Sequence, residues 1–196
     1  MKKIPTLFER IYDDNGKIIG ITDNVKPGFE WVLSGYGTAT VKMDGSCCAI
    51  FNGVFYKRYD AKKGKIPPAG AIPCTPDPDP ITGHWPHWVK VGIADSADKW
   101  FVRAYMNSFP FGVSPLRDNK TYEAIGKHFN GNPHHMEVDV LIPHGMEIIT
   151  DCPRSFEGIK DFLKHNYIEG IVFWKDNEPQ CKIKRSDFGY EWPITI

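Results

Sequence analysis

The chain has 196 residues, of which 41% are hydrophobic and 24% are charged. A chain of this length can bury one hydrophobic core, and this composition is typical of a globular protein rather than of a disordered one. The 24 Lys and Arg residues balance 24 Asp and Glu residues, so the formal net charge is zero. This balance excludes the uniformly basic surface of many nucleic-acid-binding proteins, and any polyanion must bind a local basic patch.

The five cysteines show no pattern of disulfides or of metal ligands. Their number is odd, no pair has CxxC spacing, and Cys47 is adjacent to Cys48. Such usage favours a reducing compartment. The sequence also lacks an N-terminal apolar signal region and any apolar run near the roughly 20 residues that span a bilayer. We therefore expect a cytoplasmic protein with no membrane partner, and we infer no obligate protein partner.

The first predicted elements in chain order are strands. A strand over 38–41 leads into residues 42–45, and two further strands, over 46–51 and 54–59, flank Asn52-Gly53. The Asn-Gly pair accepts the positive φ angles of a type I′ turn. The sequence therefore predicts a β-hairpin directly after residues 42–45.

A proline-rich segment follows the hairpin. Residues 66–86 contain seven prolines. Proline lacks the N–H that a central strand needs for pairing, and it breaks helices. We expect this segment to be a surface excursion inside a single domain that covers residues 1–196.

Two helices are predicted in the second half of the chain. A short helix over 96–106 begins after Asp95 or Ser96, either of which can cap its first amide groups. A clearer helix follows Ser155, because apolar residues recur on one face, and it is expected to stop near Asn166.

Strands complete the predicted elements. Apolar residues alternate with acids over 136–140, which is the two-residue period of a half-buried strand. The strands 169–174 and 180–185 form a second hairpin around 176–179. These short strands and two helices predict an α+β fold of mainly antiparallel sheets with flanking helices.

Four short motifs carry candidate chemistry. In chain order they are Lys42-Met43-Asp44-Gly45, Glu123, Glu169-Gly170-Ile171-Val172 and Lys182-Ile183-Lys184. Taken singly, each motif has a plain structural interpretation as a packed lysine, a surface carboxylate, or lysines that protect a sheet edge. Side chains alternate across a strand, so Lys182 and Lys184 project from one face about 7 Å apart along the chain, where two like charges favour an anion.

The ordered motifs resemble those of the covalent nucleotidyltransferases, the superfamily of ATP-dependent DNA and RNA ligases and GTP-dependent capping enzymes. Within it, the chain is similar to the small 5′-to-3′ RNA ligases described in chordates. The resemblance runs from about Thr38 to Arg185. Its segments are residues 42–48, residues 83–89, and Tyr122-Glu123 with Asn130-Gly131-Asn132-Pro133.

The resemblance implies an ATP-grasp-like nucleotidyltransferase domain over residues 1–196. A C-terminal OB-fold module is not expected, because only twelve residues follow Lys184. The implied activity is that of an ATP-dependent RNA ligase that seals 5′-phosphate to 3′-hydroxyl RNA ends through a lysyl-AMP intermediate. ATP would be the AMP donor, and Mg²⁺, or Mn²⁺ in its place, would be the metal.

The same resemblance implies a role for each site residue. Lys42 would be the nucleophile, and Lys182 and Lys184 would be catalytic cations beside it. Glu169 and Asp44 would hold the metal. The nucleotide would be bound by Lys42, Asp44, Gly45, Arg58, Glu123, Glu169, Lys182 and Lys184, with Glu123 on the ribose hydroxyls and Arg58 on a phosphate.

This assignment meets a physical requirement of lysine chemistry. A free lysine has a pKa of about 10.4, so only about one molecule in a thousand near neutral pH offers the neutral amine that can attack phosphorus. Lys42 therefore needs activation, which we expect from Lys182, Lys184 and the metal ion as neighbouring cations. The two strand-borne lysines would also stabilise charge that develops on the α-phosphate.

Some alternatives stay open. In the segment 122–126 the glycine follows the acid, unlike the aromatic-x-Gly-Glu order that is common in the superfamily, which leaves the role of Glu123 less firmly matched. The aromatic residue that stacks on adenine is Phe129, Trp88 or Phe109. The spacing of His84 and His87 resembles part of a zinc site, but no cluster of thiols or acids completes four ligands.

Two other functions compete with RNA ligation. One is a capping-type guanylyltransferase, which uses GTP instead of ATP. The other is a non-catalytic RNA-binding module that uses the basic and aromatic residues of 57–65 and 85–88. Both predict a different response to added nucleotide.

Overall fold

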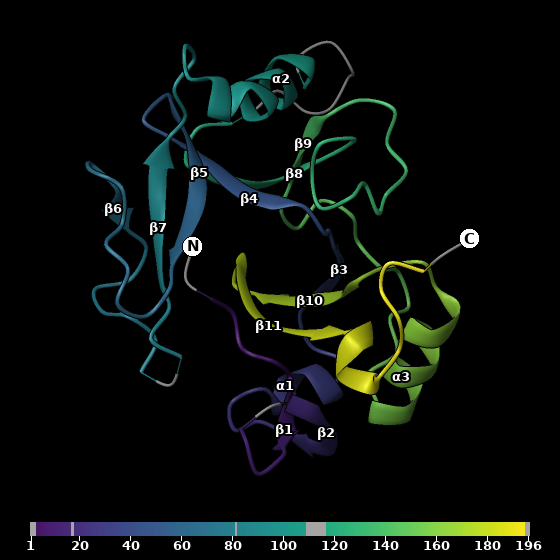
Figure 1. Cartoon of the computed structure of the whole chain (residues 1–196). Helices are drawn as coiled ribbons and strands as arrows, with labels where there is room; N and C mark the ends of the chain where they lie inside the picture. The colour runs from purple at the N-terminus through teal and green to yellow at the C-terminus, as the bar shows by residue number, and fades with distance from the viewer. Residues whose placement is uncertain (1–2, 17, 81, 109–116, 195–196) are drawn as a thin grey trace. The chain divides into compact units, whose positions relative to one another are not determined.

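The computed structural model of the protein describes residues 3–16, 18–80, 82–108 and 117–194. The chain forms two compact units (Figure 1). Unit 1 consists of Met1–Lys3 and Asp44–His144, and unit 2 consists of Ile4–Met43 and Gly145–Ile196. The chain therefore crosses from unit 2 to unit 1 inside the motif Lys42-Met43-Asp44-Gly45, between its second and third residues.

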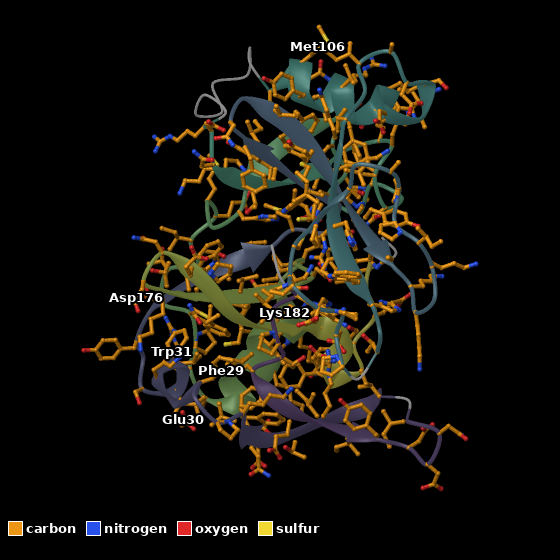
Figure 2. All side chains as sticks on the ribbon, turned by 90° about the vertical axis from the view of Figure 1, so that its left-hand side faces the viewer. Phe29, Glu30, Trp31, Met106, Asp176 and Lys182 are labelled. Atoms are coloured by element: carbon orange, nitrogen blue, oxygen red, sulfur yellow. The ribbon has the colours of Figure 1, made fainter. Side chains whose placement is uncertain are left out.

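A six-stranded antiparallel sheet forms the framework of unit 1 (Figure 1). Helix α2 (Lys99–Asn107), preceded by the short 3₁₀ helix η1 (Ser96–Asp98), packs on one face, where Ala104 is buried with Tyr122 and Leu141. The outer side of the helix carries Met106, which is 65% exposed (Figure 2). In spatial order the strands are β6 (Ile72–Pro73), β7 (Trp85–Lys90), β5 (Val54–Ala61), β4 (Ser46–Phe51), β8 (Lys120–Ile125) and β9 (Val140–Pro143).

Unit 2 contains a two-stranded and a three-stranded sheet. The smaller sheet pairs β1 (Phe8–Tyr12) with β2 (Ile18–Val25), and the larger has the order β11 (Glu178–Lys184), β10 (Gly170–Lys175), β3 (Thr38–Lys42). Three helices complete it: α1 (Glu30–Leu33), α3 (Phe156–His165) and the 3₁₀ helix η2 (Arg185–Phe188). Its core gathers fully buried residues from the strands and from α3, including Phe8, Ile159, Leu163, Phe173 and Ile183.

The fold is α+β with mainly antiparallel sheets and few helices, as the sequence predicted. Every pairing between named strands is antiparallel. The expectation that residues 1–196 form one domain stays a prediction, because two compact units are compatible with one domain or with two. Among the described residues, no helix is both long and apolar enough to cross a membrane.

Both predicted hairpins are confirmed; the Asn52-Gly53 turn has the expected backbone, and the second turn is confined to 176–177 instead of 176–179. Asn52 and Gly53 have φ angles of 50° and 70° between β4 and β5. Asp176 and Asn177 have φ angles of 55° and 61° between β10 and β11. Two successive positive φ angles define the type I′ turn, which matches the right-handed twist of the strands it joins.

Both predicted helices are also confirmed, together with their caps. The Ser155 side chain accepts a hydrogen bond of 3.1 Å from the Gly158 N–H, and α3 ends at Asn166 as its C-cap. The Asp95 side chain accepts from the Ala97 N–H at 2.9 Å, at the start of η1. Such caps satisfy amide groups that have no partner inside the helix.

The predicted strand over 136–140 is wrong. Strand β9 begins only at Val140. Before it, the Asn132 side chain holds the backbone of Met136 in a turn, with its amide group donating to the Met136 carbonyl and its oxygen accepting from the Met136 N–H. Asp139 is buried, and its carboxylate contacts His128 at 2.7 Å. Local side-chain hydrogen bonds therefore override the alternating pattern in this segment.

The proline-rich segment supplies an edge strand, and its last two residues, Trp85 and Pro86, begin the inner strand β7, so the expected surface excursion ends before them. Ile72 and Pro73 form β6, which pairs with β7 at the end of the six-stranded sheet. Proline is tolerated there because an edge strand leaves one row of backbone groups without a partner. Within 66–86, Ile81 lies outside the described residues.

Candidate functional site

Three lysines lie on one face of the three-stranded sheet of unit 2. Gly170 of the central strand β10 pairs with Lys42 of β3 on one side and with Lys184 of β11 on the other. Two residues further along, Val172 pairs with Lys182. Because side chains alternate across a strand, the three lysines project from the same face. This confirms that Lys182 and Lys184 share a face, and it adds Lys42 to them.

The opposite face of this sheet fixes the register. Ile171, Phe173, Cys181 and Ile183 are fully buried there in the core of unit 2. A slip of one residue would move lysines into the core and these apolar side chains out of it. The hydrophobic core therefore specifies which side chains occupy the lysine face.

Glu169 links two of the lysines. Its side chain is only 10% exposed, and its Oε2 atom forms a close ion pair with the Lys42 Nζ atom. The Oε1 atom lies 3.8 Å from the Lys184 Nζ atom. The Glu169 carbonyl accepts a hydrogen bond of 2.9 Å from the Arg185 N–H, which holds the backbone at the start of β10. Partial burial reduces the screening of these charges by salt.

Gly170 allows the two outer strands to meet the central one at this point. A Cβ atom at Gly170 would collide with the carbonyl oxygen of Ile183 and would lie 2.9 Å from the Lys184 Cα atom. Only glycine fits without a backbone shift. Lys42 and Lys184 thus flank a position that carries no side chain.

A tryptophan and a threonine extend the lysine face, and the sequence analysis did not identify them. The Trp174 indole N–H donates to the Thr40 hydroxyl at 2.8 Å. Thr40 precedes Lys42 by two residues, so strand alternation alone places it on this face. Its tryptophan partner depends on the β3–β10 register, which the sequence does not reveal.

In unit 1, the loop 126–136 holds Asp44 and Gly45. The Asn130 side-chain amide donates to the Asp44 Oδ1 atom at 2.9 Å and to the Gly45 carbonyl at 2.7 Å. The Asp44 N–H donates to the His134 Nε2 atom at 2.9 Å. A Cβ atom at Gly45 would collide with the Ala124 carbonyl oxygen, so glycine is required here. The sequence predicted neither the brace that Asn130 forms through its hydrogen bonds to Asp44 and Gly45 nor the contact of His134 with Asp44. Asn130 nevertheless belongs to a segment that carried the resemblance.

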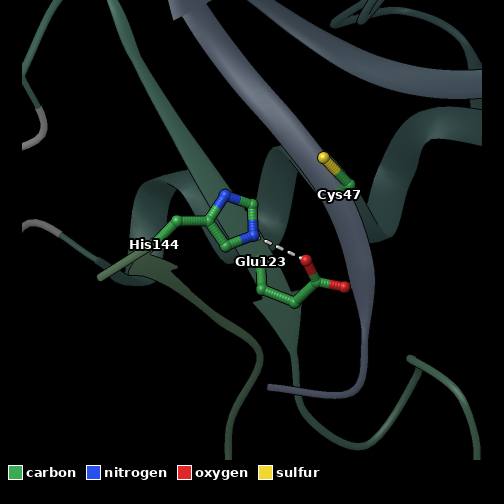
Figure 3. Close-up of side chains that lie close together, drawn as sticks. All are labelled: Cys47, Glu123 and His144. Atoms are coloured by element: carbon green, nitrogen blue, oxygen red, sulfur yellow. Dashed lines mark hydrogen bonds and ion pairs between the residues drawn. The ribbon is translucent and has the colours of Figure 1, made fainter. Parts of the chain in front are cut away.

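Glu123 lies on β8 of unit 1, and its environment is polar. The Glu123 Oε2 atom lies 2.8 Å from the His144 Nε2 atom, and His144 follows β9 (Figure 3). In the β4–β8 register Glu123 pairs with Cys47. No sequence signal pointed to His144, because its approach to Glu123 depends on the pairing of β8 with β9.

Arg58 lies on β5, where it pairs with Trp88 of β7. Its Nε and terminal amino groups both contact Asp60, each at 3.0 Å. It also neighbours Cys47: burial, with a smaller contribution from Glu123, raises the pKa of the Cys47 thiol to about 12, while Arg58 opposes that rise. Arg58 therefore forms an ion pair with Asp60 of the same strand.

The two described candidates for stacking on adenine are buried in unit 1. Phe129 is 4% exposed and packs edge-on against Phe101 in the core. Trp88 is 5% exposed and packs against Phe51. Phe109 lies outside the described residues. Either described ring would have to leave its packing to stack on a base.

The predicted nucleotide-binding residues divide between the two units. Lys42, Glu169, Lys182 and Lys184 lie together in unit 2. The remaining four, Asp44, Gly45, Arg58 and Glu123, belong to unit 1. Their roles toward a nucleotide stay predictions.

Comparisons with known proteins point to RNA ligases. The family model for RNA ligase 1 matches residues 105–196. RNA ligase 1 of Danio rerio is 30% identical to the chain over an alignment of 141 positions, and the match covers 57% of this chain and 43% of that protein. The chain thus spans less than half the length of this relative. These matches confirm a relationship to chordate-type RNA ligases.

The family match covers only part of the site. It includes Glu123, Glu169, Lys182 and Lys184, whereas Lys42 precedes its first residue. The link between Lys42 and the matched segment is therefore structural: Lys42 pairs with Gly170 through the backbone and with Glu169 through its side chain.

Proposed function

We propose that the protein is an ATP-dependent RNA ligase that joins 5′-phosphate to 3′-hydroxyl RNA ends, with Lys42 as the residue that carries AMP. The observation that carries this proposal is the shared contact of Lys42 and Lys184 with the carboxylate of Glu169. The similarity to RNA ligase 1 supports RNA as the substrate. A cytoplasmic location is part of the proposal, since all five cysteines are free thiols.

The chemistry proceeds in three steps. The Lys42 amine attacks the α-phosphorus of ATP, so that a nitrogen–phosphorus bond forms, the bond to pyrophosphate breaks and the amine loses its proton. The AMP then passes to the 5′-phosphate of RNA, which frees Lys42. Finally, a 3′-hydroxyl attacks the activated phosphate and AMP leaves. Covalent catalysis of this kind divides one difficult step into easier ones.

Lys182 and Lys184 would stabilise the first step, the attack of Lys42 on ATP. Lys182 and Lys184 are held by β11 on the same face as Lys42. Preorganised cations stabilise the charge that develops during phosphoryl transfer without any cost of reorganisation. Glu169 holds the Lys42 side chain in position through the ion pair, and the amine must leave this pair and lose its proton before it attacks.

Two carboxylates, one in each unit, are the candidate ligands for the metal ion that the resemblance implies. Glu169 and Asp44 offer the hard oxygen atoms that suit Mg²⁺ or Mn²⁺. The Glu169 carboxylate forms ion pairs with two lysines of the lysine face, which supports a cation-binding role for it. Such an ion, when bound, would neutralise charge on the nucleotide phosphates. In unit 1, Glu123 would bind the ribose hydroxyls and Arg58 a phosphate.

Labelling with α-³²P-ATP tests the proposal. The wild-type protein should become labelled, whereas Lys42→Ala should not. Lys42→Arg should fail equally, because arginine keeps the charge but is not readily deprotonated. Lys164→Ala is the matched control, since Lys164 is an exposed lysine on α3 and should label normally. A labelled Lys42→Ala variant would refute the assignment.

Labelling with ATP or GTP, and joining of RNA or DNA ends, distinguish the ligase from the two alternative functions. Labelling by GTP in preference to ATP would favour a capping-type guanylyltransferase. RNA binding without any labelling would favour the non-catalytic module. Joining of 5′-phosphorylated RNA in preference to the matching DNA would support the ligase proposed here.

A further inference from the structure

Three potential metal ligands meet on one face of the unit 1 sheet (Figure 3). Cys47 comes from β4, Glu123 from β8, and His144 from the residue after β9. The Cys47 Sγ atom, a Glu123 carboxylate oxygen and a His144 ring nitrogen all lie within 4.8 Å of one another. All three side chains are partly exposed, so an ion can reach them.

The hydrogen bonds of His144 suit exchange of a proton for a metal ion. The His144 ring lies between the Thr121 hydroxyl, 2.9 Å from Nδ1, and Glu123, 2.8 Å from Nε2. With neutral His144 and ionised Glu123, Nε2–H donates to the carboxylate and the threonine hydroxyl donates to Nδ1. A hydroxyl also accepts hydrogen bonds, so Thr121 supports the opposite tautomer equally well, in which Nε2 presents a lone pair.

We propose that Cys47, Glu123 and His144 form a binding site for a zinc-class divalent ion, with water as the fourth ligand. A thiolate, an imidazole and a carboxylate are the donors that zinc takes in proteins. Thr121 would orient the His144 ring through its hydrogen bond with Nδ1, as partners of metal-bound histidines commonly do. The thiolate selects against Mg²⁺, which prefers oxygen ligands alone.

The geometry requires only small movements. Zinc bonds of about 2.0 to 2.3 Å in a tetrahedron place ligand atoms roughly 3.3 to 3.6 Å apart. The contact between Glu123 and His144 must therefore open by about half an ångström, and the Cys47 sulfur must approach by about 1.2 Å at most. Rotation of these partly exposed side chains would achieve both.

The protons and charges balance. On binding, the Cys47 thiol releases one proton to solvent, while the His144 proton moves from Nε2 to Nδ1. The site then holds the thiolate, the Glu123 carboxylate and the dication, with a net charge of zero. Arg58 is the neighbouring cation, and its ion pair with Asp60 offsets its charge. The site therefore tolerates a dication.

Occupation of the site should oppose nucleotide binding. This part rests on the proposed function, in which Glu123 binds the ribose hydroxyls of ATP. A carboxylate that coordinates a metal cannot accept those hydroxyl protons in the same way. Zinc would then act as an inhibitor at a position that differs from the Mg²⁺ ligands.

Co²⁺ is the probe for the site, because a thiolate–Co²⁺ bond gives a charge-transfer absorption that Mg²⁺ and oxygen ligands do not. The wild-type protein, titrated without nucleotide, should show this band at one equivalent and lose it when Zn²⁺ is added. Cys47→Ser should abolish the band. Cys48→Ala is the matched control and should keep it, since Cys48 is buried on the opposite face.

Two further variants keep the proposal falsifiable if Cys47→Ser folds poorly. His144→Gln should weaken Co²⁺ binding, and Thr121→Val should weaken it by about 10- to 100-fold, as loss of an orienting partner does. Absence of the band from the wild-type protein, or its persistence in folded Cys47→Ser, would overturn the proposal.

The proposed inhibition by Zn²⁺ is measured separately, through labelling of the protein by ATP. One equivalent of Zn²⁺ should reduce labelling of the wild-type protein by ATP, and Cys47→Ser should resist that loss. If the protein is never labelled, the proposed function fails, while the Co²⁺ titration still decides the metal site. Equal inhibition of both proteins by Zn²⁺ would contradict the link to Glu123.

Discussion

Lys42 and Lys184 lie on opposite sides of Gly170, and each contacts one oxygen atom of the same Glu169 carboxylate. The two lysines are 142 positions apart in the sequence and come from different strands. The central strand β10 brings them together because it pairs with both. The motif Glu169-Gly170 therefore serves as a junction, with an acid that binds both lysines and a glycine that leaves room between them.

Replacement of the acid tests this junction. Glu169→Gln keeps the size of the side chain but removes the charge that offsets Lys42 and Lys184. We expect loss of labelling by ATP and a decrease of about 1.5 to 3 kcal/mol in the free energy of unfolding, which is typical of hydrogen bonds to charged groups. Urea denaturation measures the second effect. Glu178→Gln, at an exposed position of β11, should change neither quantity.

Replacement of the glycine tests the packing of the same junction. Gly170→Ala would drive its Cβ atom into the Ile183 carbonyl. Overpacking of this kind costs about 1 to 3 kcal/mol of stability. Gly20→Ala is the matched control, since Gly20 also lies in a strand of unit 2 and its added Cβ atom would meet only the Ile11 side chain, at 3.9 Å. Equal thermal stability of the two variants would contradict the close approach at Gly170.

The sequence predicted the elements whose signals are local. The turn at Asn52-Gly53, the cap at Ser155 and the shared face of Lys182 and Lys184 all follow from a few neighbouring residues, and the structure confirms them. The strand expected over 136–140 failed for an equally local reason. The Asn132 side chain captures the Met136 backbone, and hydrophobic alternation carries no signal for such a contact.

Contacts that depend on strand register could not be predicted from the sequence. The pairing of Glu169 with Lys42 requires that β10 lies between β3 and β11, and the approach of His144 to Glu123 requires the β8–β9 register. Neither pairing leaves a mark in the spacing of residues along the chain. Resemblance to a family selected Lys42 and Glu169, while the physical link between them came from the structure.

The loop that holds Asp44 provides a third prediction. Asn130 has a φ angle of 46°, so Asn130→Gly preserves the backbone while it removes the amide that binds Asp44 and Gly45. We expect slower labelling by ATP with a loss of stability near 1 kcal/mol, the usual contribution of hydrogen bonds of this kind. Asn119→Gly, at another exposed residue with positive φ, serves as the control. Unchanged labelling kinetics would show that the brace has no part in the reaction.

The thiols give a prediction that depends on pH. Burial raises the pKa of Cys181 to about 12, and that of Cys152 to about 11. Only the thiolate reacts with iodoacetamide, so about one Cys181 thiol in ten thousand is reactive at pH 8. Alkylation of Cys181 should therefore be slow in the native protein and should rise about tenfold per pH unit below its pKa. Cys74 is only half-buried and should react faster.

Peptide mapping after alkylation at two pH values measures these rates, and denaturant should make all five cysteines reactive. Native Cys181 that reacts as fast as Cys74 at pH 8 would contradict its place in the core of unit 2, where it is fully buried on β11. It would also question the register that places Lys182 on the other face.

The most direct test of the central claim is the intact mass of the protein after incubation with ATP and MgCl₂, followed by mapping of the modified peptide. We predict a gain of one AMP, attached through an acid-labile nitrogen–phosphorus bond to Lys42, and no gain in Lys42→Ala. An unchanged mass, or AMP attached to another residue, would contradict the account.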